Sequence, residues 1–408
     1  MNIPAAFPAY LPRLVLAHPN DGALTIARRL VRRGIEVHAL TDERYAYVLA
    51  SRGVTGRVMP PFAERPDVWA DELWALAERG GGVVLSGSDA ATEWLARNRS
   101  ELPSSLWTFE SKDGVHLALM NKFELYRAAR EAGVRTPGMW HVASRSALDE
   151  VLDETRAEVA YPCIVKPTLG HVAKSAVGVG TVRVDSPAEL DAAAGALLDH
   201  HLDLVVTELV PGPESALEGA VTIRDRDRGY LLEYGRRKVR QWPPDYGTGS
   251  LLESADVPEM LALNRRLLDH VDFHGLSSCE AKRHAVTGEL YLIEINVRLP
   301  ANYGLSQACG ADGAWRTYAA LAGLPIATMP RPRTGRKVVM HPDLLAAWHQ
   351  IRTEPRSLPR VLASWRGVRD TGVLSLRDPR PAIAMVRDEL RAVQAPCVQV
   401  AEHQPGLA

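Results

Sequence analysis

One stretch of the sequence begins at Glu280, reads EAKRHAVTGELYLIEINVR and places oxygen-bearing side chains at a spacing suited to metal binding. A turn at Thr287-Gly288 precedes an apolar strand over residues 291–296. On that strand Glu294 and Asn296 are two positions apart, so their side chains leave the same face. If the turn closes a hairpin, Glu280 lies on the neighbouring strand and three oxygen ligands converge. Such ligands suit Mg²⁺, which proteins commonly hold with one or two carboxylates plus substrate phosphates.

The alternative for this stretch is an edge hairpin whose polar residues face water, which is the commonest fate of Glu and Asn. Leu292, Ile293 and Ile295 argue against it, because they indicate a strand that is buried around its polar residues. We therefore predict a Mg²⁺ site used in phosphoryl chemistry, for which Mn²⁺ can substitute. Its three predicted ligands are Glu280, Glu294 and Asn296.

Two lysines occupy positions where a bound anion would balance their charge. Lys166 lies at the end of an apolar strand, residues 161–167, where a buried charge is costly unless it is paired. Lys122 follows Asn121 at the start of a predicted helix, and a helix N-terminus also favours anions. The alternative is a pair of surface lysines whose aliphatic stems lie along the protein. We predict that phosphates supply the pairing charge.

Together these motifs resemble those of the ATP-grasp superfamily, in the order that the superfamily requires. Its Mg²⁺-binding segment is an acidic residue followed by a strand that carries Glu-x-Asn. The other matching segments are Met120-Asn121-Lys122, Tyr161 to Pro167 and Val205 to Glu214, so the resemblance covers about residues 115–320. It implies that Lys122 and Lys166 contact the phosphates of ATP, and that Arg298, on the face of Asn296, contacts phosphate or substrate.

The same resemblance implies a hinge that receives the adenosine part of ATP. Extended backbone at Glu208, Leu209 and Val210 would bind adenine, and Glu214 would take the ribose hydroxyls unless it is an ordinary loop carboxylate. Residues 168–180 are predicted to be a loop of small residues whose backbone N–H groups approach phosphate. Ser175 belongs to this nucleotide-binding loop, and its neighbours His171 and Lys174 either contact phosphate or face solvent.

A dense basic run, YGRRKVRQWPPDYGTGS, follows the hinge. In a strand, Arg236, Lys238 and Arg240 share one face, where they would orient a carboxylate substrate and its acyl phosphate. The alternative is a solvated edge strand protected by its charges. The run resembles the Arg-Lys-x-Arg-Gln-x-Pro-Pro signature of D-aspartate ligase-like carboxylate–amine ligases. Arg298, Lys238, Arg240 and Arg236 are the predicted catalytic residues.

Composition narrows the class of protein further. The 408 residues carry a formal net charge of −1, so no global field recruits nucleic acid or an anionic membrane. No apolar run approaches the roughly 20 residues that span a bilayer, and the first residues lack the pattern of a signal peptide. We therefore expect a cytoplasmic protein. The four cysteines form no Cys-x-x-Cys pair, so neither zinc nor a disulfide framework is indicated.

The order of predicted elements divides the chain into three parts of an α/β protein. Residues 1–112 read as a Rossmann-like β-α-β lobe, and the absence of Gly-x-Gly-x-x-Gly after its first strand disfavours nicotinamide binding. Residues 113–325 are the predicted ATP-grasp domain, with a small lobe over about 113–207 and a large lobe over about 208–325. Residues 326–408 are the predicted C-terminal extension, which follows a Pro- and Arg-rich linker.

These observations predict a ligase that uses ATP and Mg²⁺ to phosphorylate a small-molecule carboxylate and then joins it to an amine, releasing ADP and phosphate. Two alternatives stay open: an enzyme with another acceptor (a carboxylase or an acyl-thiol ligase) and a non-catalytic nucleotide-binding sensor. The sequence identifies neither the acid nor the amine. It also leaves the oligomeric state open, with a homodimer as the default.

Overall fold

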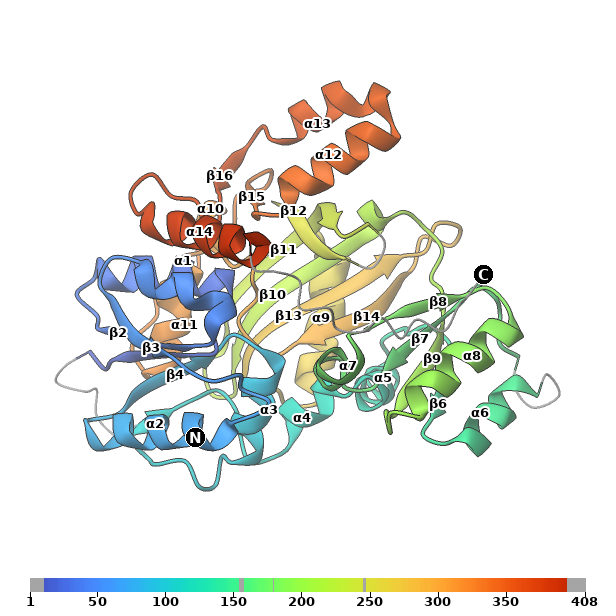
Figure 1. The fold of residues 1–408 in the computed structure, drawn as a ribbon, viewed down its shortest axis with the longest axis horizontal. Helices are drawn as coiled ribbons and strands as arrows, with labels where there is room; N and C mark the ends of the chain where they lie inside the picture. The colour runs from blue at the N-terminus through green and yellow to red at the C-terminus, as the bar shows by residue number, and fades with distance from the viewer. Residues whose placement is uncertain (1–10, 154–157, 179, 245–246, 395–408) are drawn as a thin grey trace.

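The computed structural model describes residues 11–153, 158–178, 180–244 and 247–394, which form three β-sheets (Figure 1). The N-terminal sheet is parallel and has the order β3-β2-β1-β4-β5. Its elements are β1 (Leu14–Ala17), α1 (Asp21–Val31), β2 (Val37–Thr41), η1 (Glu43–Ala50), β3 (Val54–Val58), α2 (Pro66–Glu78), β4 (Gly82–Ser86), α3 (Asp89–Arg97) and β5 (Leu106–Trp107). The alternation of strands and helices predicts this parallel arrangement.

Two helices, α4 (Val115–Met120) and α5 (Lys122–Glu131), lead to the small sheet, which is antiparallel with the order β6-β9-β7-β8. Asn121 caps α5 by accepting hydrogen bonds from the backbone N–H groups of Phe123 and Glu124, as its residue type predicts. The elements of the small sheet are β6 (Met139–Val142), α6 (Arg145–Leu152), β7 (Cys163–Pro167), α7 (Gly170–Val177), β8 (Val182–Val184), α8 (Pro187–Leu198) and β9 (Leu204–Glu208).

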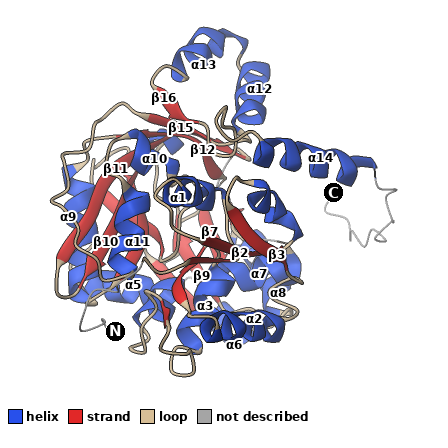
Figure 2. Cartoon of the chain, turned by 90° about the vertical axis from the view of Figure 1, so that its left-hand side faces the viewer, coloured by secondary structure: helices blue, strands red, loops and turns tan. Residues whose placement is uncertain are grey.

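The large sheet has the order β14-β13-β10-β11-β12-β15-β16 and occupies the centre of Figure 1. Its elements are η2 (Glu214–Ala216), β10 (Leu217–Asp225), β11 (Gly229–Trp242), β12 (Thr248–Ser254), α9 (Pro258–His270), β13 (Gly275–Arg283), β14 (Leu290–Asn296), α10 (Gly304–Ala308), α11 (Gly313–Leu321), β15 (Lys337–Val339), α12 (Asp343–Thr353), η3 (Pro355–Ser357), α13 (Leu358–Ser364), β16 (Val368–Asp370) and α14 (Arg380–Gln394). Strands after residue 326 thus extend the large sheet, and α12 and α13 project from it (Figure 2). Helix α14 packs against η1 of the N-terminal part.

The hydrophobic cores decide which face of the large sheet is available to a ligand. Helices α4, α5 and α9 cover one face through a buried cluster that includes Leu125, Leu267, Ala281 and Leu292. The alternation of a strand then sends the side chains of Glu280 and its even-numbered neighbours to the opposite face. Another buried cluster joins α1 and the N-terminal sheet to the large sheet and α11. The N-terminal sheet therefore packs directly beside the large one.

One element differs from its prediction. The small residues of 168–180 predict a loop, but residues 170–177 form the helix α7. Ala173, Lys174 and Ala176 are good helix formers, and no glycine interrupts the helix between Gly170 and Gly178, where it ends with a φ of 71°. Among the described residues, no helix is both long enough and apolar enough to cross a membrane.

Candidate active site

The predicted metal ligands come together on two neighbouring antiparallel strands. In the register of β13 and β14, Glu280 lies directly opposite Glu294, and Ser278 lies opposite Asn296. Directly opposed side chains have Cβ atoms about 5 Å apart, so both carboxylates can reach one ion. The Asn296 Nδ2 atom lies 3.2 Å from Oε1 of Glu294, which shows that these two side chains also share a face. The hairpin inferred from the sequence brings the three oxygen-bearing groups together.

Glu280 is already surrounded by positive charge from β11. The Arg236 guanidinium donates to its carboxylate at 2.7 Å, and Lys238 Nζ lies 3.5 Å from the other oxygen. Burial by itself would raise the pKa of Glu280, but the charges of Lys238 and Arg236 outweigh it and lower that pKa to about 2. Glu280 is therefore an anion at neutral pH.

This donor set fits a hard divalent cation. It consists of two carboxylates and one carboxamide on rigid strands, and oxygen donors are what Mg²⁺ prefers. Across the part of the chain that the structure describes, no trio of His, Cys, Asp or Glu is placed to hold a metal ion. A metal at Glu280, Glu294 and Asn296 would therefore rely on the amide and on a substrate's oxygens to complete its coordination.

Gly219 makes the contact between Arg236 and Glu280 possible. It sits on β10 between the two, opposite Arg236 on one side and opposite Glu280 on the other. A Cβ atom at Gly219 would lie 3.0 Å from Nε of Arg236 and 3.1 Å from its Cγ. The missing side chain thus leaves a path along which the guanidinium crosses β10 to reach β13.

We predict that Gly219→Ala displaces the Arg236 guanidinium from Glu280 and lowers the free energy of unfolding by about 1–3 kcal/mol, the usual cost of overpacking. Urea unfolding of a double-mutant cycle with Arg236→Ala measures it. Once the Arg236 side chain is gone, the added methyl group has room, and its cost should fall below about 0.5 kcal/mol. An equal cost of Gly219→Ala in both backgrounds would show that the glycine serves another purpose.

The two predicted phosphate-binding lysines approach the site from the small sheet and from α5. Lys122 is the first residue of α5, and its backbone N–H donates to the carbonyl of Thr168 at 3.0 Å. Its Nζ reaches α7, since a Cβ atom at Gly170 would lie 3.2 Å from it. Burial lowers the pKa of Lys122, and the carboxylate of Glu294 opposes that change. Lys122 therefore lies within electrostatic reach of Glu294 on β14.

Lys166 on β7 is the more strongly perturbed of the pair. Burial, and then the charge of Lys122, lower the pKa of Lys166 to about 8, while Glu294 raises it. If its cation binds phosphate, the affinity for MgATP is highest below pH 8 and is lost as the pH rises through 8. About 90% of Lys166 is charged at pH 7 and about 10% at pH 9.

We therefore expect the Kd for MgATP to rise about tenfold between pH 7 and pH 9, as measured by isothermal titration calorimetry. Lys166→Arg keeps its charge throughout this range, so its affinity should vary less than about twofold over the same interval. A wild-type affinity that is constant from pH 7 to pH 9 would remove Lys166 from the phosphate site.

The structure places the predicted hinge at the end of β9. The Glu208 carboxylate accepts a hydrogen bond from the Gly138 backbone N–H at 2.7 Å, while Leu209 is half-buried and Val210 is buried. Glu214 begins η2, and its charge raises the pKa of Lys282, which burial lowers. Lys282 lies two residues beyond Glu280 on the same face of β13, so the predicted hinge borders β13.

Two predicted site residues are placed differently from the expectation. Ser175 lies on the exposed surface of α7, because the predicted loop is a helix. Arg240 does not join Arg236 and Lys238 at Glu280, because the register of β11 shifts between Lys238 and Arg240. Its guanidinium instead forms a bidentate ion pair with the buried Asp343 of α12, at 2.8 and 2.7 Å. The predicted basic face is thus divided between two carboxylates.

Arg298 connects the end of β14 to the N-terminal sheet. Its guanidinium pairs with Asp89 at the start of α3, at 2.6 Å, and donates to Oδ1 of Asn296 at 3.2 Å. On the same helix Glu93 binds His171 of α7 at 2.6 Å. Sequence reasoning missed Asp89 and Glu93. The only signal was their position after β4, at the carboxyl edge of a parallel sheet, where ligands commonly bind.

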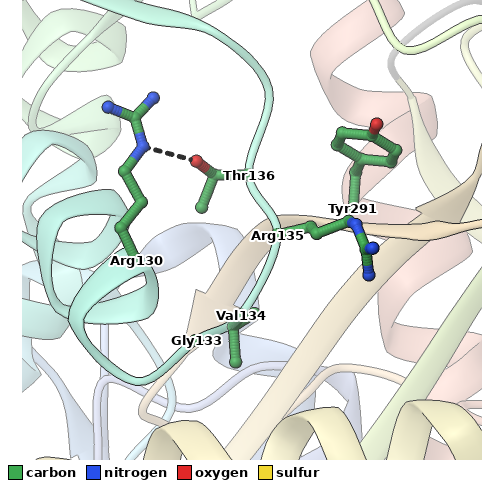
Figure 3. Close-up of a pocket in the computed structure, with 6 residues that line it drawn as sticks. All are labelled: Arg130, Gly133, Val134, Arg135, Thr136 and Tyr291. Atoms are coloured by element: carbon green, nitrogen blue, oxygen red, sulfur yellow. Dashed lines mark hydrogen bonds between the residues drawn. The ribbon is translucent and has the colours of Figure 1, made fainter.

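A separate surface cavity of about 390 Å³ contains none of the predicted site residues (Figure 3). It lies beside the edge strand β14, where the Arg135 carbonyl accepts a hydrogen bond from the Leu292 N–H at 2.9 Å. Both arginines that line it are engaged, since Arg130 donates to Thr136 at 2.8 Å and Arg135 pairs with Glu289 at 2.6 Å. Its full lining is Arg130, Gly133, Val134, Arg135, Thr136 and Tyr291.

Comparison with solved structures identifies the fold. The biotin carboxylase domain of 2-oxoglutarate carboxylase from Hydrogenobacter thermophilus, solved with MgADP and bicarbonate, superposes with a TM-score of 0.65 at 15% identity, over 80% of this chain and 74% of that one. L-amino acid ligase from Bacillus licheniformis gives 0.61 at 14% identity, over 80% and 79%. N5-carboxyaminoimidazole ribonucleotide synthetase from Thermus thermophilus gives 0.59 at 18% identity, over 79% and 81%.

No protein-family model matches the sequence, and no curated protein matches it. The structural similarity extends over about four fifths of the chain. The chain therefore has the α/β ATP-grasp fold, and the fold class expected from the four motifs is confirmed.

Proposed function

We propose that this protein is an ATP-dependent carboxylate–amine ligase. It would transfer the γ-phosphoryl group of ATP to a small-molecule carboxylate and join the resulting acyl phosphate to an amine, with release of ADP and phosphate. The observation that carries the proposal is the pair of opposed carboxylates, Glu280 and Glu294, within electrostatic reach of two half-buried lysines, Lys122 and Lys166. A phosphate chain with a divalent cation is a ligand that would balance both charges at once.

In this proposal each charged group has one task. Glu280, Glu294 and Asn296 would hold Mg²⁺, which supplies charge neutralisation on the phosphates when it is bound. Lys122 and Lys166 bind phosphate oxygens, and the hinge at Glu208, Leu209, Val210 and Glu214 holds the nucleoside. Arg298 is placed to contact the transferred group, because it lies beside Asn296.

Arg236 and Lys238 are the residues that we assign to the carboxylate substrate. Both are buried and both contact Glu280 in this structure. A cation bound to Glu280 would take over part of the neutralisation of that carboxylate. The two basic side chains would then be available to a second anion, which is the acid to be activated. Arg240 holds α12 in place of contacting this anion, because Asp343 already satisfies its guanidinium.

The proposal is tested by measuring phosphate release from MgATP with amino acids supplied singly and in pairs. Hydroxylamine in the same assay converts an acyl phosphate into a stable hydroxamate, which reports activation of the carboxylate without the natural amine. Release that depends on bicarbonate or on a thiol in place of an amine would indicate a carboxylase or an acyl-thiol ligase. Binding of ATP without phosphate release from any acid would indicate a sensor.

A further inference from the structure

The carboxyl edge of the N-terminal sheet carries a polar cluster that the proposed nucleotide site does not use. The chain passes from β1 to β2 on one side of the sheet, while β4 pairs with the other side of β1. The strand order therefore reverses between β1 and β4. In open parallel sheets the crevice at such a reversal is the usual place for a ligand. His18 follows β1 at this edge, and Ser88 follows β4.

His18 bridges the ends of three strands. Its Nδ1 atom lies 2.6 Å from Oγ of Ser88, and its Nε2 atom lies 2.9 Å from Oδ2 of Asp42, which follows β2. Phe62 stacks on the imidazole with ring centroids 5.8 Å apart, and Trp69 meets it edge-on at 5.5 Å. Ring contacts and hydrogen bonds together fix the orientation of the imidazole.

The backbone of His18 has a φ of 50°, in the left-handed region that residues other than glycine seldom adopt. Such a conformation costs free energy, and it persists only where the surrounding structure holds it. The side chains of His18 and Asp42 are not fully enclosed, since 15% and 20% of them, respectively, remain exposed. An orientation held at this cost, next to solvent, is typical of a functional group.

The hydrogen bonds determine where the protons lie. Burial raises the pKa of Asp42, but the hydrogen bond with His18 opposes it and the net pKa is lowered, so Asp42 is an anion that only accepts. Nε2 of a neutral His18 must therefore carry the proton, and Nδ1 must accept from the Ser88 hydroxyl. Ser88 Oγ also accepts the Ala91 N–H at 3.1 Å, as the cap of α3.

The hydroxyl oxygen of Ser88 can accept one more hydrogen bond. A hydroxyl oxygen has two acceptor lone pairs, and within the described residues only the Ala91 N–H donates to Oγ. The remaining lone pair is the place for an N–H group of a ligand. A proton given to Ser88 can pass to Nδ1 of His18, whose positive charge Asp42 then balances.

The loops that carry this cluster are hydrogen-bonded to the segment that follows β14. Asn20 donates from Nδ2 to the carbonyl of Leu299 at 2.7 Å and to that of Gly87 at 2.8 Å, and it is 5% exposed. The Leu299 N–H donates in turn to the Ser86 carbonyl. The residue after Ser88 is Asp89, the partner of Arg298. The segment that follows β14 is thus hydrogen-bonded to the loop that carries Ser88.

We propose that Ser88, His18 and Asp42 form a proton relay for the amine substrate, an inference that rests on the proposed function. The amine arrives as an ammonium ion and gives one proton to Ser88, while the hydroxyl proton moves to His18. The free amine then attacks the acyl carbon; the C–N bond forms as the C–O bond to phosphate breaks, and phosphate leaves with the electron pair. The second N–H proton goes to water.

His18→Asn tests this relay, because asparagine tolerates the left-handed backbone conformation and lacks the imidazole. We expect ligation, assayed with each L-amino acid as acid and as amine, to fall about 10²-fold in kcat, within the range for general-base catalysis. Hydroxamate formation with hydroxylamine, which is largely unprotonated at pH 7.5, should stay within about twofold of wild type. Asp42→Asn, which disturbs the tautomer without removing the ring, should show the same split to a smaller extent.

His141→Asn is the matched control, since His141 of β6 makes a similar ion pair with Asp203 at 2.8 Å away from this edge. It should leave both reactions unchanged. Equal losses of ligation and hydroxamate in His18→Asn, or wild-type ligation by that variant, would overturn the relay alone. Absence of hydroxamate from wild-type protein with every acid would overturn the proposed function and the relay with it.

Discussion

Replacement of Glu294 by glutamine is expected to lower ATP-dependent phosphate release roughly 10²- to 10³-fold, as for the loss of one preorganised charge partner in an active site. The substitution keeps the size of the side chain and its contact with Asn296, but it removes one of two opposed carboxylates. The rate of phosphate release at saturating MgATP, with the acid that the wild-type protein activates, gives kcat. Thermal unfolding with and without MgCl₂ gives an independent readout of cation binding.

The same substitution has a second effect, on the lysines. The Glu294 carboxylate raises the pKa of Lys122 and of Lys166 against the effect of burial. Without that charge, both lysines should lose their protons at a lower pH than in the wild-type protein. The Kd for MgATP should therefore rise in Glu294→Gln, and the pH at which affinity is lost should move below 8.

Glu289→Gln is the control for this prediction, because Glu289 belongs to the same hairpin but pairs with Arg135 at the surface. Its phosphate release should stay within about twofold of wild type. If Glu294→Gln turns over as fast as Glu289→Gln, the opposed carboxylates do not hold the metal. The proposed chemistry would then have to be located elsewhere in the molecule.

The largest expected effect on stability comes from Asp343→Ala, which should lower the free energy of unfolding by about 3–5 kcal/mol. The Asp343 carboxylate is fully buried and accepts hydrogen bonds from Arg240, from Ser250 Oγ at 2.8 Å and from Trp365 Nε1 at 2.7 Å. Removal of the carboxylate leaves the Arg240 guanidinium, whose side chain is only 8% exposed, without its counter-ion. Urea unfolding followed by tryptophan fluorescence measures the change.

Asp256→Ala is the matched surface control, because Asp256 and Arg331 form an exposed pair at 3.4 Å. An exposed pair contributes little, so its loss should change stability by less than about 1 kcal/mol. Limited proteolysis should also cleave α12 and α13 faster in Asp343→Ala than in wild type, since this ion pair attaches them to β11. Equal stability of the two variants would mean that Arg240 finds another partner.

The strand spacing, the turn and the helix cap could be recognised in the sequence because each is a pattern of a few nearby residues. The two-residue spacing of Glu294 and Asn296 puts both on one face of any strand. The Thr287-Gly288 turn closes the hairpin of β13 and β14, and a register shift between Glu280 and Ala281 then brings Glu280 opposite Glu294. Asn121 caps the helix that starts at Lys122. Periodicity and capping are properties of a few consecutive residues, so they need no knowledge of the rest of the fold.

The predictions for Ser175 and Arg240 differ from the structure because longer-range effects override local patterns. Residues 170–177 contain enough helix formers to outweigh the small-residue pattern that predicted a loop. A register shift in β11, which depends on pairing with β12, turns Arg240 away from the partner of Arg236. A bulge of this kind arises from the fit between two strands, and the sequence of one strand does not reveal it.

The sequence by itself therefore predicted the fold class, through the resemblance of its ordered motifs to a known superfamily, and the hairpin of β13 and β14, through its turn and its apolar residues. It also singled out Lys122 and Lys166 as candidate phosphate-binding residues. The tertiary structure alone decided which distant residues meet these groups. Asp89 reaches Arg298 across 209 positions of the chain, and Asp343 reaches Arg240 across 103. His18, Asp42 and Ser88 meet only because parallel strands end at one edge of a sheet. Such contacts depend on the packing of whole sheets, and no short-range pattern encodes them.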